Sequence, residues 1–280
     1  MSSRRKNAKP EKAARTPFVA RPFEGLVDET EWVALREVVP AATAPLTLTS
    51  GVQVTLSTVL PLAWPGMVTL HGGRWLGLQV ASRSGDASRD LAAVLEEVAV
   101  ADPGSSVTPV DLPGPGARLQ DLLLPGPLEV TVHQGFDYWL EGAEDQDEET
   151  TASMERANAT IVPTARLSAV PSAYWCRMKQ RSHLRWVLPE KEEPLLDALA
   201  RLSGKGGLSL GDTTRYVGSF RAHGLLVPVW DLPVAMEPGE LEEPVAALRS
   251  RLDEALGGGP LTSEERRARA GLLSRQLTLR

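Results

Sequence analysis

Two apolar runs separated by a short turn occupy the stretch Thr213 to Leu232, which reads T-T-R-Y-V-G-S-F-R-A-H-G-L-L-V-P-V-W-D-L. Aromatic and β-branched residues on both sides of a turn that contains glycine predict a β-hairpin. Its polar groups are Arg215, Arg221 and His223. We expect the hairpin to be a core element around which the chain packs, with an apolar face made of Tyr216, Phe220, Leu225, Val227, Val229 and Trp230.

The length and composition indicate a globular protein with two halves. The chain has 280 residues, of which 42% are hydrophobic and 24% charged, so it can bury a sizeable core. Its single cysteine, Cys176, excludes an internal disulfide and a thiolate metal cluster and suits a reducing compartment. The first ten residues lack the apolar core of a signal peptide, and no apolar run approaches the roughly 18 residues that span a bilayer. We therefore expect a cytoplasmic protein with no membrane contact.

The charge is distributed unevenly along the chain. Residues 1 to 21 carry seven basic groups and one acid, Glu11, which gives this segment a charge of +6 within a chain of net charge −6. The remainder is therefore strongly acidic and should repel nucleic acid. Any contact with RNA is expected to run through the tail, whose candidate nucleic-acid-binding residues are Arg4, Arg5, Lys6 and Lys9.

The fold expected from the pattern of elements is α+β, because the strand-like runs come in clusters and do not alternate with helices. Each half should be a mostly antiparallel sheet covered by helices. The expected segments are a disordered basic tail (1–17), an N-terminal half (18–140), an acidic linker loop (141–150), a C-terminal half (151–258) and a basic C-terminal helix (259–280). This last helix has few apolar residues, so we expect it to lie on the surface or to dock on a partner protein.

Several local sequence patterns predict individual helices, strands and core residues. A helix should follow Thr30, which would cap it, and end before Pro40, and Gly72-Gly73 should join two strands. Residues 136–140 and 159–166 are expected to be strands, and Trp75, Trp186 and Trp230 are expected to be core residues. Arg74-Trp75-Leu76 is echoed by Arg185-Trp186-Val187, which is consistent with an internal duplication.

No motif for a cofactor or metal is complete. Ser203-Gly204-Lys205-Gly206-Gly207 lacks the first glycine and the final Ser or Thr of a phosphate-binding loop, so we interpret it as the end of a helix. The four histidines show no metal-ligand spacing, and nothing near Cys176 in the sequence supplies a base that would activate it. We predict no metal and no cofactor, and a buried, inert thiol.

A second candidate site lies at the predicted hairpin. Arg221 and His223 flank its turn and could bind an anion, with the region of Trp186 nearby. The alternative is that both polar residues simply face solvent at the end of a strand.

Several segments resemble an actinobacterial family of unknown function, and the likeness extends over nearly the whole chain. They are S-R-R-K-N-A-K-P, R-P-F-E-G-L, E-W-V-A-L-R-E, L-P-G-P-G-A-R-L-Q-D and G-S-F-R-A-H-G-L-L-V-P-V-W-D-L-P. Members of the family are sometimes labelled preprotein translocase SecA or topoisomerase II. The sequence contradicts both labels, because it has no phosphate-binding loop, too few cysteines for a zinc tail and too short a chain for a topoisomerase. The resemblance implies a bacterial protein and adds no site.

The function expected from these observations is that of a non-catalytic interaction protein whose basic tail contacts RNA, with the ribosome as one candidate partner. The alternative is an enzyme whose site is assembled from distant residues near Arg221 and His223. A deep pocket with convergent polar groups would favour the enzyme, and a shallow surface would favour the binding protein.

Overall fold

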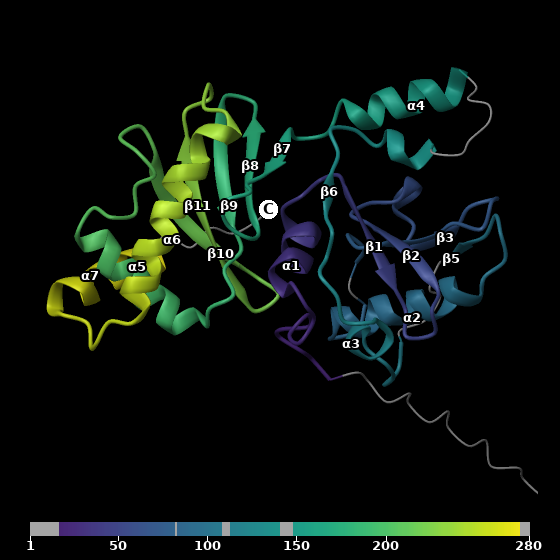
Figure 1. Ribbon diagram of the computed structural model, residues 1–280, viewed down its shortest axis with the longest axis horizontal. Helices are drawn as coiled ribbons and strands as arrows, with labels where there is room; N and C mark the ends of the chain where they lie inside the picture. Colours follow the sequence, from purple (N-terminus) through teal and green to yellow (C-terminus); the bar gives the residue numbers. More distant parts are fainter. Residues whose placement is uncertain (1–16, 82, 108–112, 141–147, 275–280) are drawn as a thin grey trace, which may run out of the picture.

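The protein contains two β-sheets that lie on either side of helix α1 (Figure 1). The computed structural model describes residues 17–81, 83–107, 113–140 and 148–274. The basic tail up to residue 16, most of the acidic linker and residues 275–280 lie outside these ranges. The predicted α+β class with two mostly antiparallel sheets is confirmed.

The N-terminal sheet has the strand order β5-β3-β4-β2-β1-β6. All neighbouring strands are antiparallel except β2 and β4, which run parallel. The predicted Gly72-Gly73 hairpin joins β3 to β4, and Gly72 adopts a φ of 84° that favours glycine. The strands are β1 (Ala42–Thr47), β2 (Gln53–Ser57), β3 (Gly66–Val68), β4 (Arg74–Gly77), β5 (Ser106–Val107) and β6 (Thr131–Val132).

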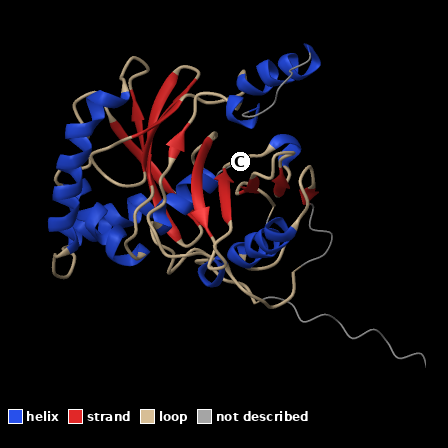
Figure 2. Ribbon diagram, turned by 45° about the vertical axis from the view of Figure 1, so that its right-hand side comes forward, coloured by secondary structure: helices blue, strands red, loops and turns tan. Residues whose placement is uncertain are grey.

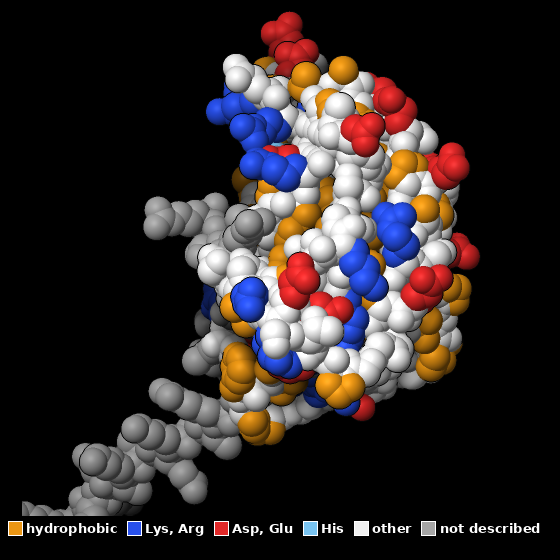
Figure 3. Space-filling view, turned by 90° about the vertical axis from the view of Figure 1, so that its left-hand side faces the viewer, with side chains coloured by type: hydrophobic (Ala, Val, Ile, Leu, Met, Phe, Trp, Pro, Cys, Tyr) orange, Lys and Arg blue, Asp and Glu red, His pale blue; other side chains and the backbone are white. Residues whose placement is uncertain are grey.

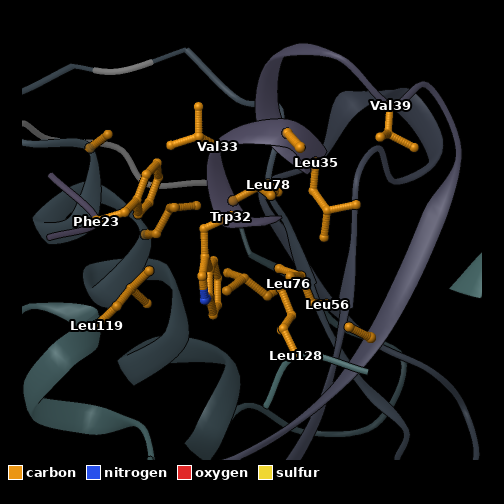
Figure 4. Close-up of a cluster of buried hydrophobic side chains, with 14 of the residues drawn as sticks. Phe23, Trp32, Val33, Leu35, Val39, Leu56, Leu76, Leu78, Leu119 and Leu128 are labelled. Atoms are coloured by element: carbon orange, nitrogen blue, oxygen red, sulfur yellow. The ribbon is translucent and has the colours of Figure 1, made fainter. Parts of the chain in front are cut away.

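Helices α1 (Glu29–Glu37), α2 (Ala87–Val100) and α3 (Leu119–Leu122) pack with this sheet. Helix α2 buries an apolar face that consists of Leu91, Val94, Leu95 and Val98. Helix α1 ends before Pro40 as predicted, but Asp28, and not Thr30, occupies its N-cap. In Figure 4, Trp32 of α1 lies among leucines from several elements, including Leu76 and Leu119.

The C-terminal sheet is antiparallel throughout, with the strand order β10-β11-β9-β8-β7. The predicted hairpin is confirmed as β10 and β11, joined by a two-residue turn at His223 and Gly224. Both turn residues have positive φ, 47° and 82°, as a type I′ turn requires. The strands are β7 (Thr164–Arg166), β8 (Ala173–Met178), β9 (Arg181–Trp186), β10 (Arg215–Ala222) and β11 (Leu225–Leu232).

Both faces of the C-terminal sheet are covered over much of their area. Tyr174, Val187 and Val227 belong to the same buried cluster as α1. Trp186 and Trp230 face the opposite way, into a second cluster with α5 (Glu192–Gly204), α6 (Glu242–Leu256) and α7 (Ser263–Ser274). Figure 2 shows these helices on the outer side of the sheet. Burial on both sides explains why β11 is a nearly continuous apolar run.

Helix α1 is tied to the C-terminal sheet by a buried carboxylate. Glu31 is only 2% exposed and accepts hydrogen bonds from the Arg166 guanidinium at 2.7 Å and from the Ser172 backbone N–H at 3.0 Å. Tyr174 donates its hydroxyl to the same carboxylate at 2.5 Å. Burial, followed by the charge of Glu31, raises the pKa of Tyr174. The charge of Glu31 is therefore compensated from the neighbouring half of the chain.

Four further local predictions are wrong. Residues 137–140 form a short 3₁₀ helix, and in the segment 159–166 only β7 is a strand. Glu148 and Glu149, expected in an extended loop, begin helix α4 (Glu148–Asn158), where acids near the N-terminus are favourable. Trp75 is half-buried, because β4 turns this side chain toward Tyr138 and the rim of a small aromatic cluster.

The C-terminal helix α7 lies on the surface, as expected, and packs against α5. Leu272 is buried in the shared core, and Arg269 forms ion pairs with Glu193 and Asp197 of α5. Thr262 and Glu265 form a capping box at its N-terminus. The helix therefore has a partner within the chain, and a further protein partner stays a prediction.

The internal duplication is not supported by the strand arrangement. Strand β4, which carries Trp75, has a parallel neighbour, whereas β9, which carries Trp186, has antiparallel neighbours on both sides. Trp75 is half-buried and Trp186 is fully buried. The two similar tripeptides therefore occupy positions that are not equivalent.

Candidate functional site

A hollow on the α1-facing side of the C-terminal sheet combines charged and apolar side chains. It has a volume of about 360 Å³ and is called here the inner hollow. Strands β9, β10 and β11 supply its lining, which consists of His183, Arg185, Arg215, Val217, Phe220, Val229 and Asp231. The antiparallel register places His183 and Arg215 on either side of Asp231, and places Arg185 opposite Val229. One end of the hollow is thus charged and the other apolar.

A second, shallow hollow adjoins the charged end and shares Arg215 and Asp231 with the first. It has a volume of about 560 Å³ and is called here the outer hollow. Its lining comes from the ends of the strands and their loops, and includes Gln180, Arg181, Asp212, Thr213, Thr214 and residues 232–234. The two hollows therefore adjoin at Arg215 and Asp231, and we refer to them together as the depression.

Asp231 lies between the hollows and accepts hydrogen bonds from two arginines. Arg181 Nη1 and Arg215 Nη2 each lie 2.8 Å from Asp231 Oδ2. Burial alone would raise the pKa of Asp231, but the hydrogen bond from Arg215 and the charges of His183, Arg181 and Arg215 outweigh it and lower this pKa. Arg181 and Arg215 are 64% and 71% exposed, so much of each guanidinium stays accessible to a ligand.

His183 presents one edge of its ring to the inner hollow. Its Nδ1 is buried and lies 3.1 Å from Asp231 Oδ1, at an angle that falls short of a hydrogen bond. The side chain as a whole is 19% exposed, so the accessible part of the ring is the opposite edge. Burial lowers the pKa of His183, and the charges of Arg185 and Arg181 reinforce this, against the opposing effect of Asp231.

Arg185 is the least compensated charge of the site. Its Nη2 lies 3.3 Å from the thioether sulfur of Met178, a weak acceptor. It makes no ion pair with any carboxylate of the described residues, although it is only partly exposed. A guanidinium in such surroundings is a strong donor for an added anion.

Cys176, His183 and Asp231 are cross-strand neighbours on β8, β9 and β11. These are the residue types of a cysteine nucleophile with its base and orienting acid. The thiol is only 1% exposed, and burial raises its pKa. Within the described part of the chain it makes no hydrogen bond to the imidazole. Its burial agrees with the predicted inert thiol, and the arrangement does not support a nucleophile.

The polar residues proposed from the sequence are separated in the structure. Arg221 forms a bidentate ion pair with Glu192 at the start of α5. His223 Nε2 lies 2.8 Å from Glu37 Oε1, and its ring packs edge-on against Phe23. Trp186 is 1% exposed on the opposite face of the sheet, where its Nε1 donates to the Pro171 carbonyl. Each of these side chains serves a contact between elements, and they do not converge on one cavity.

The remaining sequence predictions concern the tail and the absence of metal. Arg4, Arg5, Lys6 and Lys9 lie outside the described residues. Ser203 to Gly207 form the expected helix end, where the Gly207 N–H donates to the Leu202 carbonyl. In the described ranges, no group of three or more His, Cys, Asp or Glu residues has a geometry that could hold a metal ion. No described helix combines the length and the apolar character needed to cross a bilayer.

The fold and the site define an α+β protein whose two sheets share one central helix, with an arginine-lined depression on the C-terminal sheet. The chain belongs to the family of unknown function DUF5926, whose model matches residues 22–280. No curated protein and no solved structure matches the chain.

Sequence reasoning identified Arg215 as a polar group of the hairpin but did not connect it with His183, Arg185 or Asp231. The signal that could have found the site is the alternation of polar residues along 181–185, R-S-H-L-R, which places Arg181, His183 and Arg185 on one face of a strand. Asp231 joins this group because the strand pairs with β11, and the sequence does not show which strand is the neighbour.

Proposed function

We propose that this protein is a non-catalytic, cytoplasmic interaction protein that binds RNA, and that the depression on the C-terminal sheet supplies the contact within the folded body. The basic N-terminal tail adds a second, sequence-independent contact, with the ribosome as a candidate source of the RNA. The observation that carries the proposal is the group of three arginines, Arg181, Arg185 and Arg215, which line the two hollows together with two carboxylates, Asp231 and Asp212.

The arginine group offsets the acidity of the body at one place. Arg181 and Arg215 share Asp231, and Arg185 has no carboxylate partner among the described residues. Figure 3, which faces α5 to α7, shows lysine and arginine side chains gathered at one upper edge, with acids and bases intermixed over the rest of that face. Guanidinium groups recognise phosphates by paired hydrogen bonds, and a local positive patch supports phosphate contact even on a protein of negative net charge.

The shape of the depression favours binding over catalysis. Both hollows are open to solvent, and the thiol of Cys176, next to His183 on the neighbouring strand, is buried without a hydrogen bond to that imidazole in the described residues. An enzyme site would need a reactive group within reach of a substrate and a means to exclude water. The alternative of an enzyme near Arg221 and His223 has less support, because these residues are engaged by Glu192 and Glu37.

The test is RNA binding measured by fluorescence anisotropy with a 3′-labelled single-stranded oligonucleotide at low salt. Replacing Arg185 and Arg215 together by alanine should weaken binding by at least about a hundredfold, since each lost charge-assisted hydrogen bond costs about 1.5–3 kcal/mol, or about tenfold or more in affinity. The matched control is Arg221→Ala, which removes an arginine from the far end of the same strand, β10.

The control should retain binding close to that of the unaltered protein. Equal losses in the control and in the double variant would show a general charge effect and would remove the depression from the proposal. An unaltered protein that binds no RNA at all, at any salt concentration, would contradict the proposed function itself.

A further inference from the structure

We infer that the inner hollow binds the terminal phosphate monoester of an RNA strand, while the nucleotides that follow lie along the outer hollow. This inference rests on the proposed RNA-binding function and specifies which chemical group the site recognises.

The donors of the inner hollow match a phosphate monoester better than a phosphodiester. Arg185, Arg215 and His183 line this hollow with one carboxylate, Asp231, whereas Arg181 and Asp212 line the outer hollow. A phosphate monoester carries about −1.5 to −2 charges at pH 7 and offers three acceptor oxygens. An internal phosphodiester has only two non-bridging oxygens, so it would leave one of the three side chains of the hollow without an acceptor.

The hydrogen-bond donors reach the inner hollow from two strands, β9 and β10. Arg185 and His183 come from β9 and Arg215 from β10, and all three line the same cavity. Because Arg185 bonds only the Met178 sulfur among described partners, an incoming phosphate replaces a weak acceptor and breaks no ion pair of this residue. Arg215 can keep its contact to Asp231 through Nη2 and turn its remaining N–H groups toward the ligand.

The dimensions favour a strand end over a strand that passes through. A volume of about 360 Å³ lies at the lower end of the range of roughly 300–1,000 Å³ found for small-molecule sites. Val217, Phe220 and Val229 close the inner end with apolar side chains, which a second charged phosphate could not enter without loss of solvation. The outer hollow, by contrast, is shallow and leads to the edge of the sheet.

The inference is tested with RNA oligonucleotides of one sequence that carry a 5′-phosphate, a 3′-phosphate or hydroxyl groups at both ends, with the label placed internally. One of the two phosphorylated forms should bind about tenfold more tightly than the hydroxyl form. Arg185→Ala should abolish the difference, Arg215→Ala should reduce it, and Arg221→Ala should preserve it.

A second readout reports on the site without relying on affinity. His183 is faced by Asp231, Arg181 and Arg185, and a bound dianion adds negative charge beside it. The pKa of His183, followed by NMR, should therefore rise when the phosphorylated oligonucleotide is bound and stay unchanged with the hydroxyl form. Thermal melting of each variant separates loss of folding from loss of binding.

The outcomes distinguish this inference from the function on which it rests. Equal binding of phosphorylated and hydroxyl RNA overturns the terminal-phosphate site and leaves RNA binding intact. If a free nucleoside monophosphate binds as tightly as the phosphorylated oligonucleotide, the site serves mononucleotides and the RNA part of the inference is wrong. If no oligonucleotide binds, both the inference and the proposed function fail.

Discussion

His183, Arg185, Arg215 and Asp231 show that single residues acquire their chemistry here from cross-strand neighbours, and not from neighbours in the sequence. His183 and Asp231 lie on different strands, yet their side chains meet at 3.1 Å. Arg221, in contrast, resembled a site residue in the sequence because it stands beside the hairpin turn, and its charge is taken up by Glu192. Which arginines are available to a ligand was therefore decided by strand pairing.

The protonation of His183 offers a test at this scale. Its pKa is expected below the ordinary value of 6.5, because burial and the arginines disfavour the imidazolium. Arg185→Ala should raise this pKa by removing a like charge, and Asp231→Asn should lower it further. The folded protein then binds this proton less well than the unfolded chain, so His183 should reduce stability as the pH falls below 6.5.

NMR titration of the histidine ring signals measures these shifts directly. A midpoint for His183 above 6.5, or one that does not respond to Arg185→Ala, would contradict the described arrangement of charges.

At the scale of elements, the sequence predicted regular local patterns well and irregular ones poorly. The β10–β11 hairpin, the Gly72-Gly73 turn and the end of α1 before Pro40 are all present. Residues 137–140 have the composition of a strand but form a 3₁₀ helix, because Phe136 and Tyr138 pack into a separate aromatic cluster. The site itself could not be predicted, since the neighbours of β9 are set by tertiary packing.

The tryptophans provide a stability test of these elements. Trp230→Ala and Trp186→Ala should each lower the free energy of unfolding by about 3–5 kcal/mol, because each removes a fully buried ring. Trp75→Ala is expected to have a smaller effect, since this side chain is half-buried. Urea denaturation of the three variants gives the comparison, and a loss for Trp75→Ala as large as that for Trp230→Ala would show that the rim of the aromatic cluster is more tightly packed than described.

At the scale of the whole molecule, α1 joins the two sheets into one body. Its residues Glu31 to Leu35 are all buried, and the core around it includes side chains from both sheets. The segment before α1 also lies against the turn of the C-terminal hairpin. The approach is so close that a Cβ added at Gly224 would lie 2.9 Å from the Ala20 carbonyl oxygen. The two halves expected from the position of the acidic linker therefore share one hydrophobic core.

Loss of the Glu31 carboxylate should destabilise this shared core. Glu31→Ala is expected to lower the free energy of unfolding by about 3–5 kcal/mol, because Arg166, Ser172 and Tyr174 all lose their acceptor. Glu24→Ala is the control, since Glu24 is 69% exposed and should change stability by less than about 0.5 kcal/mol. Chemical denaturation should show a single transition in which both sheets unfold together, and two separate transitions would contradict the shared core.

The tail makes its own contribution to RNA binding. If Arg4, Arg5, Lys6 and Lys9 each contact a phosphate, they contribute about −3 to the slope of log affinity against log salt, at roughly −0.7 per contact with single-stranded RNA. Deleting residues 1–16 should therefore flatten the salt dependence by about that amount and leave the preference for a terminal phosphate in place. A salt dependence that deletion does not change would show that the tail makes no phosphate contact.

The most direct test of RNA binding at the C-terminal sheet is photo-cross-linking of the full chain to RNA that contains 4-thiouridine near a phosphorylated end, followed by peptide mapping. We predict cross-links within residues 180–185, 212–217 and 231–234, which contain the lining of the two hollows at the ends of β9, β10 and β11. These cross-links should disappear when Arg185 and Arg215 are replaced by alanine. Cross-links confined to helices α5 to α7, or none on the folded body while the tail alone is labelled, would contradict this prediction.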